Sequence, residues 1–292
     1  MYEIINLRGA TKGSGVALVG ARRARIVANP DIKRASAGGG GLPCGAWKTG
    51  VAAQVIVEVE GIDEVVNAIR GELTAITLTL HYVGPDGPRR RTCKYATATA
   101  VGESRFPPAE GRGATPLSQI TFDLHAGSGI ETPAEALDDA SYSGTPPTGT
   151  VQPTVKLISA ARGTGGSTPI LSAVEAVLRC EMSKTVGRRN AYGLPQGVWV
   201  TAQAPRIAVT LEDALEWRNS LVGDVVDEIL NLTFQAGAAT RTLSARWARQ
   251  VEFGEEAMKA AEESGPPARP QLLWDIVTGT GVASVTDALV LT

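Results

Sequence analysis

The chain of 292 residues holds few side chains that could act as a nucleophile, a general base or a metal ligand. Its only histidines are His81 and His125, and its three cysteines, Cys44, Cys93 and Cys180, have no CxxC spacing. HExxH, GxSxG, a metal-spaced Cys/His set and a dinucleotide fingerprint are all missing from the sequence. We therefore expect no catalytic residue, no metal and no organic cofactor, and we interpret the cysteines as small buried residues of a reducing compartment.

A glycine-rich stretch near the N-terminus, RGATKGSG at 8–15, superficially suggests a phosphate-binding loop. Its lysine precedes the glycine, and no GK[ST] follows. We interpret this stretch, and residues 163–166 in the second half of the chain, as a flexible turn or arm.

The elements that would position any site occur twice. Sliding the sequence against itself by 152 positions aligns residues 1–140 with residues 153–292 without a gap. In the most informative block, Leu42, Pro43, Gly45, Trp47 and Thr49 meet Leu194, Pro195, Gly197, Trp199 and Thr201. The repeat predicts one structural unit used twice. We place the first domain at 1–140, a linker at 141–152 and the second domain at 153–292, because SYSGTPPTGTVQ has the Pro, Gly, Ser and Thr content of an extended linker.

The repeat also tests each candidate for chemistry. The histidines and cysteines align with other residue types, whereas four acids are shared: Asp123 with Asp275, Glu60 with Glu212, Glu64 with Glu216, and Glu103 with Glu255. Acids at helix starts and strand ends usually cap, pair or face solvent. An enzyme with its site in the cleft between the two repeats therefore remains the less favoured alternative.

Composition and periodicity predict the fold class. With 33 Gly, 17 Pro and 5% aromatic residues, the chain favours short strands and turns. We expect strands at 46–49 and 54–58, a helix over 62–69 that ends at Gly71, a hairpin of strands 73–83 and 91–101, and a last strand at 119–124. The copies are strands at 198–201 and 206–210, a helix over 211–221, a hairpin of 225–235 and 242–253, and a strand at 271–276; 255–264 also reads as a helix. We predict an α+β fold, mainly β, with two tandem copies of a β-sandwich or barrel-like domain, each with a short helix and a long β-hairpin.

Net charge and hydropathy limit the classes of partner that the chain is expected to bind. The net charge is −2, so we interpret the clusters Arg22/Arg23/Arg25, Arg89/Arg90/Arg91 and Arg188/Arg189 as solvated loop charges rather than a nucleic-acid grip. No apolar run is long enough to span a bilayer and no signal peptide is evident, so we expect synthesis in the cytosol and no membrane insertion. Trp47 and Trp199 follow a Pro-x-Gly turn, and we expect them to anchor a strand to the core.

Two fused copies of a small β-domain, each with a helix, a long polar-faced hairpin and a Gly-rich arm, resemble the tail tube proteins of long-tailed bacteriophages. The resemblance covers about 16–124 and 169–276. It implies a structural virion protein of the tail, not an enzyme, whose chains form rings of three with pseudo-sixfold symmetry and stack into a hollow tube. Its partners would be further copies of itself, other tail proteins and DNA in transit; a tail-tip or neck ring component is the nearest alternative.

The family's inner wall is built from the long hairpins, and side-chain alternation predicts which face would line it. Leu78, Leu80 and Tyr82, with their copies Leu230, Leu232 and Phe234, should pack inward, as should Tyr95 with Trp247. The lumen-facing residues would then be Thr77, Thr79, His81, Lys94, Asn231, Thr233, Arg246, Gln250 and Glu252, with Ala96, Ala98 and Ala248 beside them. Because phosphate contacts would hinder passing DNA, we expect carboxylates from Glu252 or a neighbouring chain to partner Lys94 and Arg246.

Overall fold

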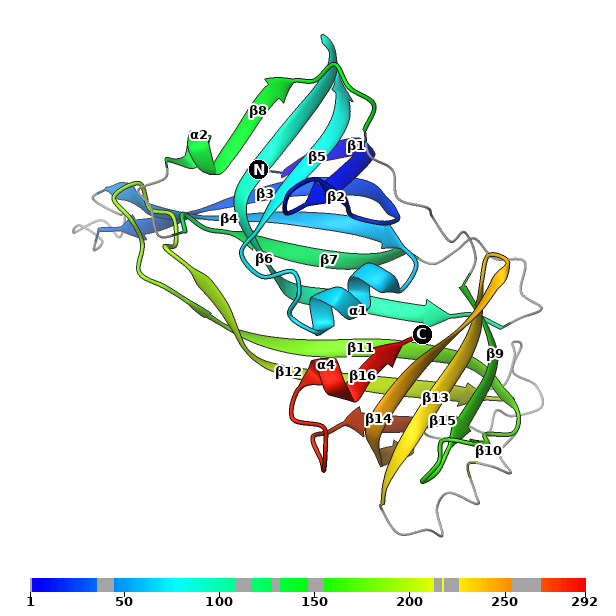
Figure 1. Cartoon of the computed structure of the whole chain (residues 1–292). Helices are drawn as coiled ribbons and strands as arrows, with labels where there is room; N and C mark the ends of the chain where they lie inside the picture. Colours follow the sequence, from blue (N-terminus) through cyan, green and yellow to red (C-terminus); the bar gives the residue numbers. More distant parts are fainter. Residues whose placement is uncertain are drawn as a thin grey trace, which may run out of the picture.

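The computed structural model describes residues 2–35, 45–108, 117–127, 132–146, 155–212, 217, 226–253 and 269–292. Most of these residues lie in the strands of one antiparallel sheet, and a few short helices accompany it, which confirms the mainly β prediction (Figure 1). The predicted helix over 211–221 falls largely outside these residues, and the predicted helix over 255–264, linker residues 147–152 and Leu42, Pro43 and Cys44 fall wholly outside them.

The first half, residues 2–146, supplies the following elements: β1 (Tyr2–Lys12), β2 (Val16–Ala17), β3 (Ala21–Arg34), β4 (Ala46–Glu60), α1 (Asp63–Ile69), β5 (Ile76–Gly84), β6 (Gly87–Phe106), β7 (Leu117–Leu124), α2 (Pro133–Ala136) and β8 (Leu137–Ser141). The second half, residues 155–292, supplies these: β9 (Val155–Arg162), β10 (Thr168–Pro169), β11 (Ala173–Val186), β12 (Val198–Leu211), β13 (Asp227–Ala236), β14 (Ala239–Phe253), β15 (Gln271–Ile276), α4 (Val285–Ala288) and β16 (Leu289–Leu291). The two series follow the same order.

Most element bounds recur at an offset of 152. β2 and β10, β3 and β11, and α2 and α4 match end to end at this offset. The β3–β4 and β11–β12 strand pairs have the same register and the same two irregularities. In the first half the register shifts before Arg23 and before Ile32, and in the second half it shifts before the aligned Glu175 and Lys184. β-Bulges are specific features of a fold, so their recurrence is a sensitive sign that the two halves have the same local geometry.

The first strand departs from the ungapped alignment. Thr11 pairs with Thr79, whereas Ala161 pairs with the aligned Asn231, so β1 matches β9 at an offset of 150. The N–H of Leu18 bonds to Ala10, as that of Ile170 bonds to Ala160. The turn after β9 is therefore two residues longer than the one after β1, and the glycine-rich prediction holds only for the turns, because residues 9–12 belong to β1.

The sheet order is β10-β9-β13-β14-β15-β12-β11-β6-β5-β1-β3-β4-β7, and β6 pairs additionally with β7. In the first half the pairings thus run from β6 through β5, β1, β3, β4 and β7 back to β6. The long strand β6 also pairs with β11 and so joins the two halves into one sheet.

Alternation along the strands and α1 builds the core. Leu78, Leu80, Leu230, Leu232 and Phe234 are fully buried, as predicted. α1 buries Val65 and Ile69 and is followed by Gly71, whose φ of +80° suits the residue after a helix end. Ala96, Ala98 and Ala248 are buried as well, so their predicted lumen-side position is wrong. The β5–β6 pair has a register shift between Ile76 and Leu78, which changes which side chains of β6 face inward. The prediction assumed unbroken alternation of inward and outward side chains.

Several predictions about surface residues are corrected. The arginines at 22, 23 and 25 lie on β3 and those at 89–91 on β6, not in loops. Trp47 and Trp199 are 53% and 54% exposed rather than anchored in the core. Trp199 covers the turn of its own hairpin, because a Cβ at Gly187 or Gly197 would meet its ring at 3.0 or 2.7 Å.

Candidate assembly interface

The histidines and the described cysteines occupy environments that suppress titration near neutral pH. Burial lowers the pKa of His81 and of His125 below the usual value. His125 accepts from the Gly127 N–H at Nδ1 (3.3 Å) and contacts the Thr97 hydroxyl through Nε2 (3.1 Å). Burial raises the pKa of Cys93 to about 12 and of Cys180 to about 11. These environments are typical of packed structural residues.

The described acids of the shared set are held by cations or backbone. Glu60 accepts from Arg22 at 2.6 Å, Glu64 from Lys12 at 2.6 Å, and Glu103 from Arg179 at 2.9 Å. Asp123 pairs with Lys184, and Asp275 with Arg206 at 2.7 Å. In the described ranges, no three His, Cys, Asp or Glu side chains gather as a metal site. The geometry therefore places these carboxylates in structural ion pairs.

The residues predicted to face the lumen differ in how exposed their side chains are. Lys94 and Arg246 are exposed, while Thr77, Thr79, Asn231, Thr233 and Gln250 are half-buried. His81 is buried beneath Tyr142, with ring centroids 4.5 Å apart. Asn231 donates to the Gly166 carbonyl (2.9 Å), and Gln250 accepts from Arg162 (2.9 Å). Arg246 forms no ion pair with any carboxylate whose side chain the structure describes, and the Glu252 side chain is not among them.

Both polar and apolar contacts join the two halves of the chain. The end of β6 adds to the edge of β11, where Val101, Ser104, Arg105 and Phe106 pair with Cys180, Leu178, Val177 and Ala176. The next residue continues the contact, because the Leu157 N–H donates to the Pro107 carbonyl at 2.8 Å. Backbone pairing of this kind is β-augmentation within one chain.

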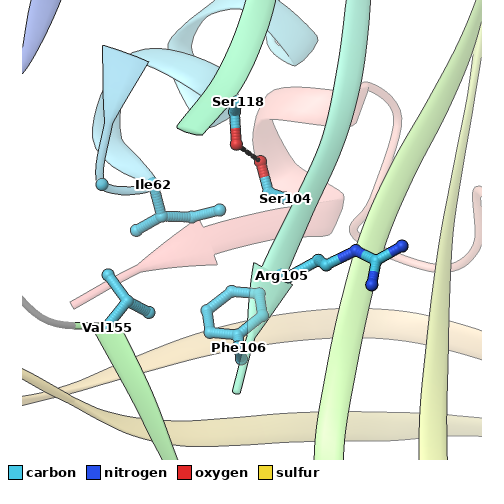
Figure 2. Close-up of a pocket in the computed structure, with 7 residues that line it drawn as sticks. Ile62, Ser104, Arg105, Phe106, Ser118 and Val155 are labelled. Carbon is cyan, nitrogen blue, oxygen red and sulfur yellow. Dashed lines mark hydrogen bonds between the residues drawn. The ribbon is translucent and has the colours of Figure 1, made fainter. Parts of the chain in front are cut away.

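Phe106 carries the apolar part of this join. Its ring is fully buried and packs 5.1 Å from the ring of Phe234. Figure 2 shows Phe106 beside Ile62 and Val155, with the Ser104 and Ser118 hydroxyls hydrogen-bonded at 2.7 Å. The space between these residues has a volume of about 10 Å³, which is no more than one water needs. The join is thus closely packed and is not a ligand site.

Ion pairs flank the strands. Arg179 of β11 binds Glu103 of β6 at 2.9 Å, and Arg241 of β14 binds Asp63 of α1 at 2.7 Å. Arg70 at the end of α1 donates twice to the Leu289 carbonyl, at 2.9 and 2.7 Å. A wider pocket of about 300 Å³ beside the join contains Glu103, Arg179, Cys180 and Arg206. Both arginines of this pocket already form ion pairs, Arg179 with Glu103 and Arg206 with Asp275. No acid–base pair is therefore evident among these four pocket residues.

The loop of the β11–β12 hairpin forms a second contact with the first half. Leu194 is 2% exposed and packs with Ala126 and Ala136, while the Ala126 N–H donates to the Pro195 carbonyl at 2.7 Å. The Val51 N–H donates to the Gly193 carbonyl at 3.0 Å. The β3–β4 and β11–β12 hairpins therefore end side by side, as Figure 1 shows on the left.

Arg189 fixes the same loop. It pairs with Asp31 and donates to the carbonyls of Gly193 (2.6 Å) and Val51 (3.2 Å). A Cβ at Gly50 would lie 2.2 Å from the Arg189 guanidinium. Gly50 thus leaves the space that the arginine fills.

The corresponding surface of the second half is uncovered. Ala126 is fully buried under the loop, whereas the aligned Thr278 is exposed. Ile32, which aligns with the ion-paired Lys184, is 54% exposed, and Trp47 is exposed like Trp199. Sequence reasoning identified the Leu-Pro-x-Gly-x-Trp block but missed that its second copy contacts the first half of the chain. The repetition of Leu and Pro in both copies is the sequence signal that could have indicated this contact.

No protein-family model matches the chain, and no curated protein matches it. No helix among the described residues is sufficiently long and apolar to cross a membrane.

Proposed function

We propose that this chain is a structural subunit made of two tandem barrel-like units, in which the contact between the units repeats between chains to form a closed ring. The observation that carries the proposal is the addition of β6 to the edge of β11. It joins similar units head to tail, and a head-to-tail contact is heterologous. Such a contact leaves one partner surface open on each outer unit, and a further chain can fill both.

The strand registers support the duplication. The pairings β4–β7, β5–β6 and β6–β7 recur as β12–β15, β13–β14 and β14–β15 at an offset of 152, bulges included. Aligned aromatic positions have like environments: Phe122 and Trp274 are fully buried, and Tyr82 and Phe234 both lie in the core. The circuit of pairings in the first half is the basis for calling a unit barrel-like.

Compensating differences support a repeat of the loop contact between chains. Gly50 makes room for Arg189, and the aligned pair is Ala202 with Ala37. In the sequence, the side chain lost at position 37 is thus matched by a Cβ gained at position 202. Likewise Lys184 pairs with Asp123, whereas Asp275 pairs with Arg206 of its own half, and the residue that aligns with Lys184 is the apolar Ile32. Both differences keep the open surfaces compatible with each other.

Three chains would give six units with pseudo-sixfold symmetry, and stacked rings would give the hollow tail tube that the resemblance implies. The hairpins β5–β6 and β13–β14 would then line a channel for DNA, with Lys94 and Arg246 as its exposed cations. The chain would belong to the virion tail, with other tail proteins as neighbours. Rings that do not stack would fit a tail-tip or neck component instead.

The test is the mass and shape of the assembled protein. Light scattering after size exclusion should give a mass of three 30.4-kDa chains or a multiple of it, and electron micrographs should show rings or tubes with six similar lobes. A stable single chain over the micromolar range, or rings of six chains, would contradict the proposal.

A further inference from the structure

β1 is divided into two parts by a register shift between Leu7 and Gly9. Residues 7–12 pair with β5, as β9 pairs with β13 in the second half. Residues 2–6 pair instead with β3, with Glu3 opposite Ile26 and Ile5 opposite Ala24. The second part of β1 therefore belongs to the repeated unit, whereas residues 2–6 form an additional pairing.

The place that residues 2–6 occupy on β3 is taken by another strand in the second half. Ala24 and Ile26 align with Ala176 and Leu178 of β11, which pair with Phe106 and Ser104 of β6. One edge is thus filled in two ways. In the second half a neighbouring unit fills it, and in the first half the chain's own N-terminus does.

The strand that would supply the missing neighbour is β14, which aligns with β6. Its last residue, Phe253, aligns with Val101, where the pairing of β6 with β11 begins. The next residues in the sequence are Gly254, Glu255 and Glu256, and the edge they would meet carries Arg22, Arg23 and Arg25. At the existing join Glu103 binds Arg179 of β11 at 2.9 Å. Val27 aligns with Arg179, so this ion pair has no counterpart on β3, and its arginines would attract the acids that follow Phe253 from other positions.

We infer that the edge of β3 is the docking surface for a second copy of this chain, and that residues 2–6 occupy it until that copy arrives. Residues 254–258 of the second copy, extended there rather than in the helix that the sequence pattern predicts over 255–264, replace these residues by β-augmentation, and the shift between Leu7 and Gly9 is the point where β1 divides. The inference rests on the proposed head-to-tail ring and adds that the free chain covers its own acceptor edge.

A disulfide lock tests the inference. In a Cys44→Ser background, Glu3→Cys with Ile26→Cys links partners that must separate. Thr11→Cys with Thr79→Cys is the matched control, because it links β1 to β5 in the part that stays. We expect the oxidised Glu3/Ile26 variant to remain single chains in sedimentation velocity, with assembly at least tenfold lower than after reduction. The oxidised control should assemble as the unmodified chain does, and ring formation by the oxidised Glu3/Ile26 variant would overturn the inference.

Deletion of residues 2–6 gives the opposite perturbation. The shortened chain should assemble faster or at several-fold lower concentration, because no strand has to leave β3. If the full chain forms rings that neither lock nor deletion alters, the inference fails and the ring proposal survives. If neither the full nor the shortened chain assembles, the ring proposal fails and the inference falls with it.

Discussion

The edges of β3 and β11 lie at aligned positions in the two halves of the chain, and they have different occupants. β11 receives β6 from the first half, while β3 receives residues 2–6 of its own half. The same contrast holds for the loop surfaces, since Ala126 is buried beneath Leu194 and Thr278 is exposed. A chain that fills each contact once internally also shows how its outer surfaces would be filled.

The largest effect is expected at the filled join. Phe106→Ala removes a fully buried ring that packs on Phe234, and such truncations cost about 3–5 kcal/mol. Urea unfolding followed by tryptophan fluorescence should show this loss in the second half, where Trp274 is buried. Phe106→Leu, which keeps most of the volume, should cost roughly 1.5 kcal/mol or less. An unchanged transition for Phe106→Ala would show that the halves are independent and would break the comparison.

The loop contact offers a matched pair of substitutions. Leu194→Ala should destabilise the single chain by about 2–3 kcal/mol, because Leu194 is buried against Ala126 and Ala136. Leu42→Ala is its aligned counterpart, and we expect it to leave the stability of the single chain within about 0.5 kcal/mol while reducing ring formation. Chemical denaturation measures the first quantity and light scattering the second. Equal effects of both variants on the single chain would show that Leu42 docks within its own chain.

These contrasts bear on what the sequence can predict. Alternation predicts β5, β6, β13 and β14, and helical spacing predicts α1, because each buries a face against its own unit. The strands β3 and β11 were missed, since arginines on the exposed side of β3 resemble loop charges. In the structure Arg22 binds Glu60 across the strand pair at 2.6 Å. The short strands β8 and β16 lack enough residues for a periodic signal.

The joins between units were hidden for a different reason. Phe106, Pro107 and Pro108 indicate only that a helix is disfavoured, and nothing in their local pattern specifies the edge of a strand about 70 residues further along the chain. The sequence predicts that Trp47 and Trp199 anchor a strand to the core, because large aromatic side chains are usually buried, but both are exposed. Trp199 lies on the β11–β12 hairpin, whose loop extends beyond the second half to contact the first.

The pH dependence of stability should separate the two units. In the first, Asp139 is bound by Arg91 (2.8 Å), Arg89 (3.1 Å) and Tyr82 (3.0 Å). Burial alone would raise the pKa of Asp139, but these hydrogen bonds outweigh it and lower the pKa below 3.8. The second half has Leu291, Leu243 and Phe234 at the positions that align with Asp139, Arg91 and Tyr82, and therefore no carboxylate there. Arg241, which aligns with Arg89, pairs with Asp63 instead.

A lowered carboxyl pKa stabilises the folded state above the unfolded pKa, and the contribution is lost as the pH falls through the folded value. Asp139→Asn should therefore cost on the order of 1 kcal/mol at pH 7 and progressively less below about pH 4. Denaturation of both proteins at several pH values gives the difference. A difference that stays constant from pH 7 to pH 2 would assign the effect to geometry rather than to charge.

The smallest effect on the single chain is expected at the exposed tryptophans, where the comparison can be sharpened without disturbing the fold. Trp47 and Trp199 occupy aligned positions with nearly equal exposure, 53% and 54%, so Trp47→Phe and Trp199→Phe should each change the stability of the single chain by less than about 0.5 kcal/mol.

Trp199 lines a surface pocket with Arg70 and Gly71, at the end of α1 in the other half. If the contact between units repeats between chains, Trp47 must face the matching helix end of a second copy. The fluorescence assigned to Trp47, taken as the difference between the unmodified protein and Trp47→Phe, should then become less accessible to iodide on assembly, while that of Trp199 should change little because its neighbour is already in place. Equal protection of both tryptophans would indicate stacking of rings over this face, and no protection of Trp47 in an assembled ring would place the contact between chains elsewhere.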